Sequence, residues 1–320
     1  MTSAPDSFLE LYLKPIAPYL ARRDVTDVYV NQPGELWIET LGGVTERFQV
    51  PELDTASLWR LAWQVASETG QGISAQHPLL AATIPGGGGR VQVVAAPATR
   101  DGVAIAIRQH RALSVGLEDY ARPTSQTQTG DEAADVAALL VRRDYPAILA
   151  WAVRARKNIL ISGGTSTGKT TLLNSLLREV SREERLIFIE DTPELSLSHP
   201  NSVGLIAVRG SQGEAQVTSE DLLQAALRMR PDRIILGELR GPEAFTFLRA
   251  INSGHPGSMT TIHADSPERA FVQLAMMALQ VGLGLAYADI LALVQEMVDV
   301  VAQVERTAGG RRIASVIVRA

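Results

Sequence analysis

One short segment limits the possible folds more than any other: a glycine-rich turn between an apolar run and an amphipathic helix. Residues 163–170 read Gly-Gly-Thr-Ser-Thr-Gly-Lys-Thr, which matches the phosphate-loop pattern G-x-x-x-x-G-K-[ST]. The apolar triplet 159–161 is typical of a buried strand, and the leucines that follow the loop share one helical face. A strand, a tight turn and a helix N-terminus direct backbone N–H groups and a positive helix dipole at one point. The segment therefore predicts a binding site for a nucleoside triphosphate.

The side chains of this loop have predicted partners as well. We expect Lys169 to reach the β- and γ-phosphates and the Thr170 hydroxyl to bind Mg²⁺. The loop contacts phosphates rather than a base, so ATP and GTP both remain open at this stage. The predicted nucleotide-binding residues of the loop are Gly163, Gly164, Thr165, Ser166, Thr167, Gly168, Lys169, Thr170 and Thr171.

Length and composition exclude several classes of protein. A chain of 320 residues, of which 46% are hydrophobic, is long enough for two domains with a core each. Cysteine is absent, which excludes disulfides, cysteine-type zinc sites and thiol catalysis, and fits a reducing cytosol. The net charge of −5 argues against strong intrinsic nucleic-acid binding. The uncharged residues 270–288 are interrupted by glutamines and glycines, which favours two packed helices over a membrane span.

The N-terminal part, residues 1–115, is expected to be an α+β domain with one sheet. Its expected strands are 25–30, 35–39, 91–95 and 103–107, and its expected helices are 8–13 and 53–69. A four-glycine run at 86–89 favours a flexible hairpin or edge loop over a second phosphate loop, because no helix follows it. Polar, apolar-poor sequence then predicts a flexible interdomain linker at residues 116–134.

Residues 135–320 alternate between strand and helix patterns, which predicts a doubly wound, mostly parallel sheet and an α/β fold overall. Together with the phosphate loop, this pattern indicates a RecA-like P-loop NTPase domain. The expected strands are 158–162, 185–190, 203–208, 233–237 and 258–262. The expected helices are 169–180, 218–230 and 242–252.

Two of the expected strands end in acids, and ligands bind at the carboxyl ends of strands in such sheets. One ends in Glu190 and Asp191, and the other in Glu238, where the usual residue of a phosphate-loop enzyme is Asp. Such an enzyme needs one carboxylate to hold or hydrate Mg²⁺ and another to orient the attacking water. Acids at strand ends can also simply cap the next helix. Beside a phosphate loop, we expect Glu190 and Glu238 to be catalytic, and Glu190 and Asp191 to bind Mg²⁺ directly or through water.

Two histidines flank the last of these strands. His255 precedes a glycine-containing turn and His263 follows the strand, so we expect both near the nucleotide edge of the sheet. As a metal pair they lack a third ligand nearby. We expect one or both to sense the γ-phosphate, with His263 in the catalytic set and His255 among the nucleotide-binding residues.

Four segments together resemble a known family. Residues 163–170, 189–194, 234–241 and 254–264 look like the Walker A, Asp, Walker B and His boxes of the type II/type IV secretion ATPases, in the same order and spacing. Residues 227–233 and 249–257 are most similar to the type IV branch, the eleventh VirB component. Residues 13–18 and 30–36 of the N-terminal domain also fit this branch.

This resemblance implies an ATP- and Mg²⁺-dependent hydrolase that forms a homohexamer. It implies a cytoplasmic motor, peripheral at the inner membrane, that works with other components of a secretion or conjugation machine in pilus biogenesis or substrate translocation. It further implies that the N-terminal domain supplies arginines to the nucleotide. Arg90 and Arg108 occupy matching places and Arg240 is a weaker candidate, although Arg108 could also be a solvated strand end.

Three alternatives remain. A type II secretion or pilus-assembly ATPase is less consistent with the sequence, because many of those carry a four-cysteine zinc element. A DNA translocase is disfavoured by the acidic charge and by the lack of a basic stripe interleaved with aromatic residues. A nucleotide-binding scaffold without hydrolysis is disfavoured because Lys169, Thr170 and Glu238 are all present.

Overall fold

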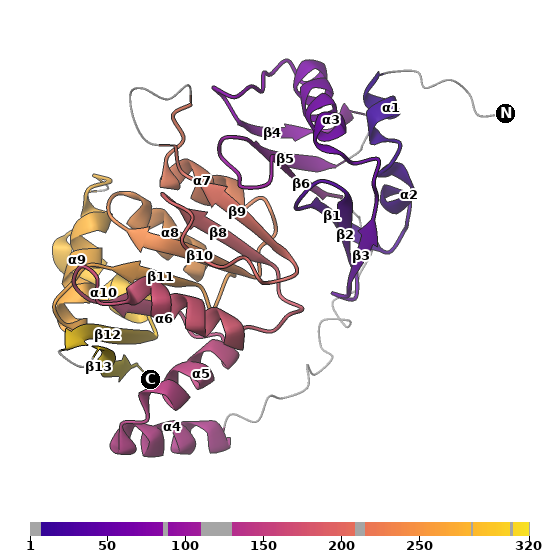
Figure 1. Ribbon diagram of the computed structural model, residues 1–320. Helices are drawn as coiled ribbons and strands as arrows, with labels where there is room; N and C mark the ends of the chain where they lie inside the picture. Colours follow the sequence, from indigo (N-terminus) through magenta and orange to yellow (C-terminus); the bar gives the residue numbers. More distant parts are fainter. Residues whose placement is uncertain are drawn as a thin grey trace, which may run out of the picture.

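The computed structural model describes residues 8–85, 89–109, 130–208, 215–282, 284–307 and 310–319, with only the backbone of 130–135. Two α/β units are visible along the chain, indigo to purple for the first and magenta to yellow for the second (Figure 1). Most of the four-glycine run and most of the predicted linker lie outside the described residues. The helix α4 (Gly130–Arg142) begins inside the range predicted as linker.

The N-terminal unit combines helices with one antiparallel sheet. Its sheet has the order β3-β2-β1-β6-β5-β4. The strands are β1 (Val25–Val30), β2 (Glu35–Thr40), β3 (Thr45–Gln49), β4 (Leu79–Thr83), β5 (Arg90–Ala95) and β6 (Val103–Arg108). The helices are α1 (Phe8–Leu13), α2 (Ala17–Leu20) and α3 (Thr55–Glu68). The Asp54 side chain caps α3 by accepting from the backbone N–H of Ser57 (2.7 Å), which fixes the start of the helix that covers the core.

The C-terminal unit contains a seven-stranded sheet of order β13-β12-β7-β11-β10-β8-β9. All of its neighbouring pairs are parallel except β12 with β13, so the predicted mostly parallel sheet is confirmed. The strands are β7 (Ile159–Ser162), β8 (Leu186–Glu190), β9 (Ser202–Ile206), β10 (Arg233–Leu239), β11 (Met259–Ile262), β12 (Val300–Thr307) and β13 (Gly310–Val318). The remaining helices are α5 (Tyr145–Arg154), α6 (Lys169–Leu176), α7 (Ser219–Ala226), α8 (Glu243–Asn252), α9 (Pro267–Leu279) and α10 (Tyr287–Met297).

Helices cover both faces of this sheet, which makes it doubly wound. In β8, Leu186 and Phe188 pack with α5 and α6 on one face. Ile187 and Ile189 pack with α7, α8 and α9 on the other face. This alternation follows from the two-residue period of a strand, and it gives each face its own apolar layer.

The uncharged stretch 270–288 forms parts of two helices that pack against each other, α9 and α10, as predicted. Among the described residues, no helix is long and apolar enough to cross a membrane. Two predicted helices are shorter than expected. Helix α6 ends at Leu176 and continues as a 3₁₀ turn, and α7 ends at Ala226.

The two domains share a buried polar contact centred on Arg185. Its guanidinium donates to Asn31 Oδ1 of the N-terminal domain (2.6 Å), to Asn201 Oδ1 (2.7 Å) and to the carbonyl of Met229 (2.9 Å). It also lies over the ring of Tyr29, 3.9 Å from the ring centroid. Burial lowers the pKa of Arg185 to about 10. A buried guanidinium with these partners fixes the position of the N-terminal sheet against β8.

Candidate nucleotide site

The phosphate loop connects β7 to α6 and requires glycine at two positions. A Cβ at Gly163 would lie 2.6 Å from both the carbonyl oxygen of Val304 and the Thr167 hydroxyl. Gly168 has φ +97°, and a Cβ there would lie 2.6 Å from the Cδ of Arg311. Residues other than glycine rarely adopt that backbone conformation. The loop is therefore built as the sequence pattern predicts, directly before the N-terminus of α6.

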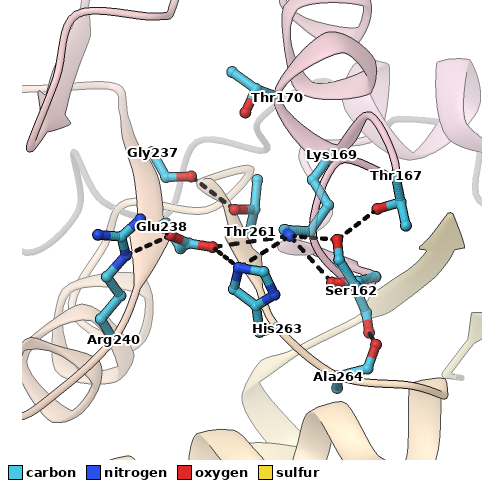
Figure 2. A network of polar contacts seen from close by, with 12 residues as sticks. Ser162, Thr167, Lys169, Thr170, Gly237, Glu238, Arg240, Thr261, His263 and Ala264 are labelled. Carbon is cyan, nitrogen blue, oxygen red and sulfur yellow. Dashed lines mark hydrogen bonds and ion pairs between the residues drawn. The ribbon is translucent and has the colours of Figure 1, made fainter. Parts of the chain in front are cut away.

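Lys169 points back across the loop that precedes it. Its side chain is 8% exposed, and its Nζ donates to the carbonyls of Gly163 and Gly164, both at 3.1 Å. The Nζ also lies 3.8 Å from Glu238 Oε1 and 3.5 Å from His263 Nε2 (Figure 2). Burial lowers the pKa of Lys169, while the nearby Glu238 carboxylate opposes this shift. Lys169 is thus a buried cation whose present partners are weak enough to be replaced by phosphate oxygens.

Glu238 is the centre of a small ion-pair network. Its Oε1 lies 3.0 Å from His263 Nε2, and its Oε2 forms an ion pair with Arg240 (Figure 2). The pairing of β10 with β11 shifts register between Leu236 and Leu239, so Glu238 lies at an irregular point of its strand. Such an irregularity re-aims a side chain. The structure thereby brings Lys169, Glu238 and His263 together, while their chemical roles remain predictions.

Arg240 extends this network to Asp191. Its Nη1 lies 3.3 Å from Asp191 Oδ2, and the Asp191 Oδ1 also accepts from the Ser219 hydroxyl (3.3 Å). Burial lowers the pKa of Arg240, but its hydrogen bond and ion pairs with Glu238 and Asp191 raise it by more. Arg240 remains charged and links the acids at the ends of β8 and β10.

Glu190 is held by protein groups on both of its oxygens. Its Oε1 accepts from the backbone N–H groups of Glu194 (2.8 Å) and Leu195 (2.7 Å), and its Oε2 forms an ion pair with Arg100. The carboxylate next to Thr170 belongs to Glu194, whose Oε2 accepts from the Thr170 hydroxyl (3.1 Å). Glu194 was not among the predicted metal ligands, although it closes the acidic motif at residues 189–194.

These groups surround one cavity of about 440 Å³ at the carboxyl ends of β8, β10 and β11. Its lining is Thr165, Ser166, Thr167, Gly168, Lys169, Thr170, Thr171, Glu190, Asp191, Thr192, Glu194, Gly237, Glu238, Arg240, Thr261, His263 and Arg311. Arg311 was not predicted from the sequence, and it reaches the cavity from the C-terminal hairpin of β12 and β13.

The residues of this cavity fit Mg²⁺ that is bound together with a nucleotide. Within the described part of the chain, no cluster of three or more His, Asp or Glu side chains could hold a metal alone. Mg²⁺ usually takes one or two protein ligands and completes its shell with phosphate oxygens and water. The Thr170 hydroxyl beside the Glu194 carboxylate meets this requirement.

His255 does not lie where we expected it. It precedes β11, at the edge of the sheet opposite to His263, and its Nδ1 lies 3.0 Å from the carbonyl of Ala250 at the end of α8. The expected position of His255 near the nucleotide cavity of its own chain is therefore wrong. The physical reason is that His255 precedes the strand β11 and His263 follows it, so the two residues lie at opposite ends of that strand.

Arg90 and Arg108 also lie away from the phosphate loop of their own chain. They face each other on β5 and β6 and line a different cavity of about 570 Å³, together with Arg228 and Arg230 of the C-terminal domain. The N-terminal arginine that reaches the wall of the nucleotide cavity is Arg100, in the turn between β5 and β6. Nothing local in the sequence signals this long-range ion pair.

Comparison with known proteins identifies the family of this chain. The sequence model of the "Type II/IV secretion system protein" family matches residues 11–312. The chain belongs to this family. The resemblance inferred from the four sequence segments is thereby confirmed, and it extends over both domains.

Several relatives of this family member are named after the type IV branch. VirB11 of Brucella suis is 40% identical, with 92% of this chain and 85% of the relative covered. PtlH of Bordetella pertussis is 39% identical, with 96% and 94% covered. The crystal structure of the Brucella suis VirB11 ATPase in complex with sulphate superimposes with a TM-score of 0.88 at 38% identity, covering 97% of this chain and 94% of that one.

Proposed function

We propose that this chain is a Mg²⁺-dependent ATPase that drives a type IV secretion or conjugation machine. The observation that carries the proposal is the meeting of Lys169, Glu238 and His263 at one phosphate-loop cavity. The names of the relatives support the same conclusion, because they describe type IV secretion proteins and, in one case, an ATPase. The sequence alternatives, a type II or pilus-assembly ATPase and a DNA translocase, have no observation of their own in their favour.

In this proposal, the side chains that line the cavity have separate roles in binding and hydrolysis. The Lys169 ammonium exchanges the loop carbonyls for β- and γ-phosphate oxygens, and the loop N–H groups bind the rest of the polyphosphate. Glu238 orients the attacking water and accepts its proton, and His263 contacts the γ-phosphate. Thr170 and Glu194 would hold a Mg²⁺ ion, with Glu190 and Asp191 behind them, and this ion would supply positive charge to the phosphates.

The network around Glu238 suggests how hydrolysis depends on binding. The Glu238 carboxylate lies between Lys169, His263 and Arg240. A bound γ-phosphate competes with Glu238 for Lys169 and His263. The freed carboxylate oxygen can then accept a hydrogen bond from the attacking water.

We further propose a homohexamer at the cytoplasmic face of the inner membrane, built from domains 1–115 and 135–320 around a linker at 116–134. Arg90 and Arg108 line a cavity of their own chain that is separate from the phosphate loop. In the proposed ring, they serve the nucleotide of a neighbouring subunit. A guanidinium suits this role, because its fixed donors match phosphate oxygens.

Phosphate release from the purified chain tests this function. We expect ATP hydrolysis that requires Mg²⁺ and disappears in Lys169→Ala, because charge-assisted hydrogen bonds contribute roughly 1.5–3 kcal/mol each. The matched control is Lys157→Ala, a lysine of the same domain whose Nζ contacts Asp299 (3.2 Å) outside the cavity. Normal turnover in Lys169→Ala, or no turnover in the wild-type protein with Mg²⁺, contradicts the assignment.

A further inference from the structure

The turn between β5 and β6 adds to the edge of the ATPase-domain sheet. Thr99 forms an antiparallel bridge with Leu205 of β9. The Arg100 backbone N–H donates to the carbonyl of Gly204 (3.0 Å), and the Ile206 N–H donates to the carbonyl of Ala98 (3.0 Å). Main-chain bonds therefore hold this N-terminal turn in a fixed register on β9, close to the carboxyl end of β8.

This register directs the Arg100 side chain toward the nucleotide cavity. A Cβ on Gly204 would lie 2.7 Å from Arg100 Cδ, so the glycine leaves room for the side chain to pass. The guanidinium donates to the carbonyl of Leu195 (3.0 Å) and forms an ion pair with Glu190. The Arg100 side chain is 18% exposed and that of Glu190 is 3% exposed. Among the residues that the structure describes, Arg100 is the only cation within 4.0 Å of the Glu190 carboxylate.

Glu190 passes this contact on to the phosphate loop. The other oxygen of Glu190 accepts hydrogen bonds from the backbone N–H groups of Glu194 and Leu195, which fixes the backbone of the loop that follows β8. Glu194 in turn accepts from the Thr170 hydroxyl at the start of α6. A continuous series of contacts thus joins an N-terminal arginine to the two groups that fit Mg²⁺.

A buried carboxylate that loses its paired cation is left uncompensated, so the groups around it rearrange. This rearrangement moves the Glu190 oxygen that accepts from the backbone N–H groups of residues 194 and 195. The Glu194 carboxylate would then lose its fixed distance to Thr170, while Lys169 and the loop N–H groups would remain in place. Loss of the Arg100 contact should therefore change the Mg²⁺ requirement and the turnover more than it changes the affinity for nucleotide.

We propose that Arg100 is a positioning residue for nucleotide hydrolysis. Through Glu190, it holds the loop that carries Glu194, so the seating of the N-terminal domain on β9 sets the geometry at Thr170. The inference rests on the proposed ATPase function. It differs from the role proposed for Arg90 and Arg108, because Arg100 acts within its own chain and without touching the nucleotide.

Steady-state kinetics of the full-length chain test the proposal with Arg100→Ala and Arg100→Lys. We expect Arg100→Ala to lower kcat at least tenfold and to raise the half-saturating Mg²⁺ concentration at least threefold, with KM for ATP within threefold. Arg100→Lys keeps the charge and should recover most of kcat. The matched control is Glu46→Gln, which removes the charge from an ion pair within the N-terminal unit, Glu46–Arg22 (2.9 Å), away from both cavities. It should leave kcat and the Mg²⁺ requirement within twofold of wild type.

A double-mutant cycle with Glu190→Gln separates positioning from a general loss of stability. If Arg100 acts through Glu190, adding Arg100→Ala to Glu190→Gln should lower kcat less than twofold further, because contacting residues are not additive. An independent tenfold loss in that background overturns the proposal. So does wild-type kcat and Mg²⁺ dependence in Arg100→Ala, or in Arg100→Gln if the alanine variant is unfolded. An inactive wild-type protein would instead refute the ATPase function itself.

Discussion

Glu238→Gln is the most direct test of the catalytic assignment, because it changes one atom in the centre of the site. In the structure, Oε1 of Glu238 faces Lys169 at 3.8 Å and His263 at 3.0 Å, and Oε2 faces Arg240. An amide keeps one oxygen for Lys169 and His263 and places its NH₂ group toward Arg240. The shape of the side chain and one acceptor survive, whereas the negative charge and the basicity are lost.

The expected loss of activity is much larger than the expected loss of stability. General-base catalysis contributes about 10²–10⁴-fold, which corresponds to roughly 2.7–5.4 kcal/mol in activation free energy. The Arg240 side chain is 54% exposed and keeps Asp191 at 3.3 Å. Exposed ion pairs contribute about 0–1 kcal/mol, so losing the pair with Arg240 should change the unfolding free energy by no more than this.

Phosphate release and equilibrium binding of a non-hydrolysable ATP analogue, both with Mg²⁺, provide the two measurements. We expect turnover to fall at least a hundredfold while binding persists. Glu179→Gln, on a surface ion pair with Arg154 (3.1 Å), is the control for an acid of the same domain. Turnover within threefold of wild type would falsify the catalytic role of Glu238. Loss of binding would instead place Glu238 among the groups that hold the metal.

The same variant predicts a pH effect on binding. Lys169 binds phosphate in its protonated form, so affinity falls as the pH rises through its pKa. Burial already lowers the pKa of Lys169, and the Glu238 charge raises it again. Removing that charge should lower the pKa further, so the alkaline loss of analogue binding should begin at a lower pH in Glu238→Gln than in wild type. Coincident binding profiles would show that Glu238 does not act on Lys169.

Three further predictions follow from the assembly, the second cavity and a buried histidine. Light scattering with Mg²⁺ and a non-hydrolysable analogue should give the mass of six subunits, and a strict monomer would contradict the ring. Arg108→Ala should lower turnover at least tenfold, or about 1.4 kcal/mol, with Arg90→Ala weaker, and unchanged rates would remove both from the nucleotide site. Burial lowers the pKa of His199 below its ordinary value of 6.5, so the unfolded chain binds the proton more tightly. Stability should therefore be complete above pH 6.5 and decrease as the pH falls toward the folded-state pKa. The melting temperature should depend less on pH in His199→Gln than in wild type across this range. Equal dependence on pH in the two proteins would refute the reasoning.

The second domain was predictable because its signals are local. The phosphate loop and the alternating strands and helices each occupy a short window of sequence, and β7, β8, β10 and β11 form close to their expected ranges. Strands β3, β4, β12 and β13 were not predicted. They are stabilised by side-chain packing against their neighbours in the sheets, which a single segment of sequence does not show.

The position of His255 and the role of Arg100 were not predicted correctly, because both depend on distances within the folded sheet. A four-residue strand such as β11 is roughly 13 Å long, so His255 and His263 cannot both lie at its carboxyl end. The importance of Arg100 depends on pairing between Thr99 and Leu205, which are far apart in the sequence. A contact of this kind has no periodic or compositional signature, so the sequence offered no means of finding it.

Two of the interdomain contacts lie at the same strand, and this explains how a domain movement could reach the nucleotide. Arg185 directly precedes β8 and Glu190 ends it, so the N-terminal domain contacts both ends of a strand about 16 Å long. Separating the Arg185 end would leave buried polar groups without partners, at about 1–3 kcal/mol for each. At the other end, the Arg100 side chain is partly exposed and can exchange its partners with water. A rotation that keeps the Arg185 contact and loosens the Arg100 contact therefore costs less than full separation. That rotation changes the surroundings of Glu190 while the core of the ATPase domain stays packed.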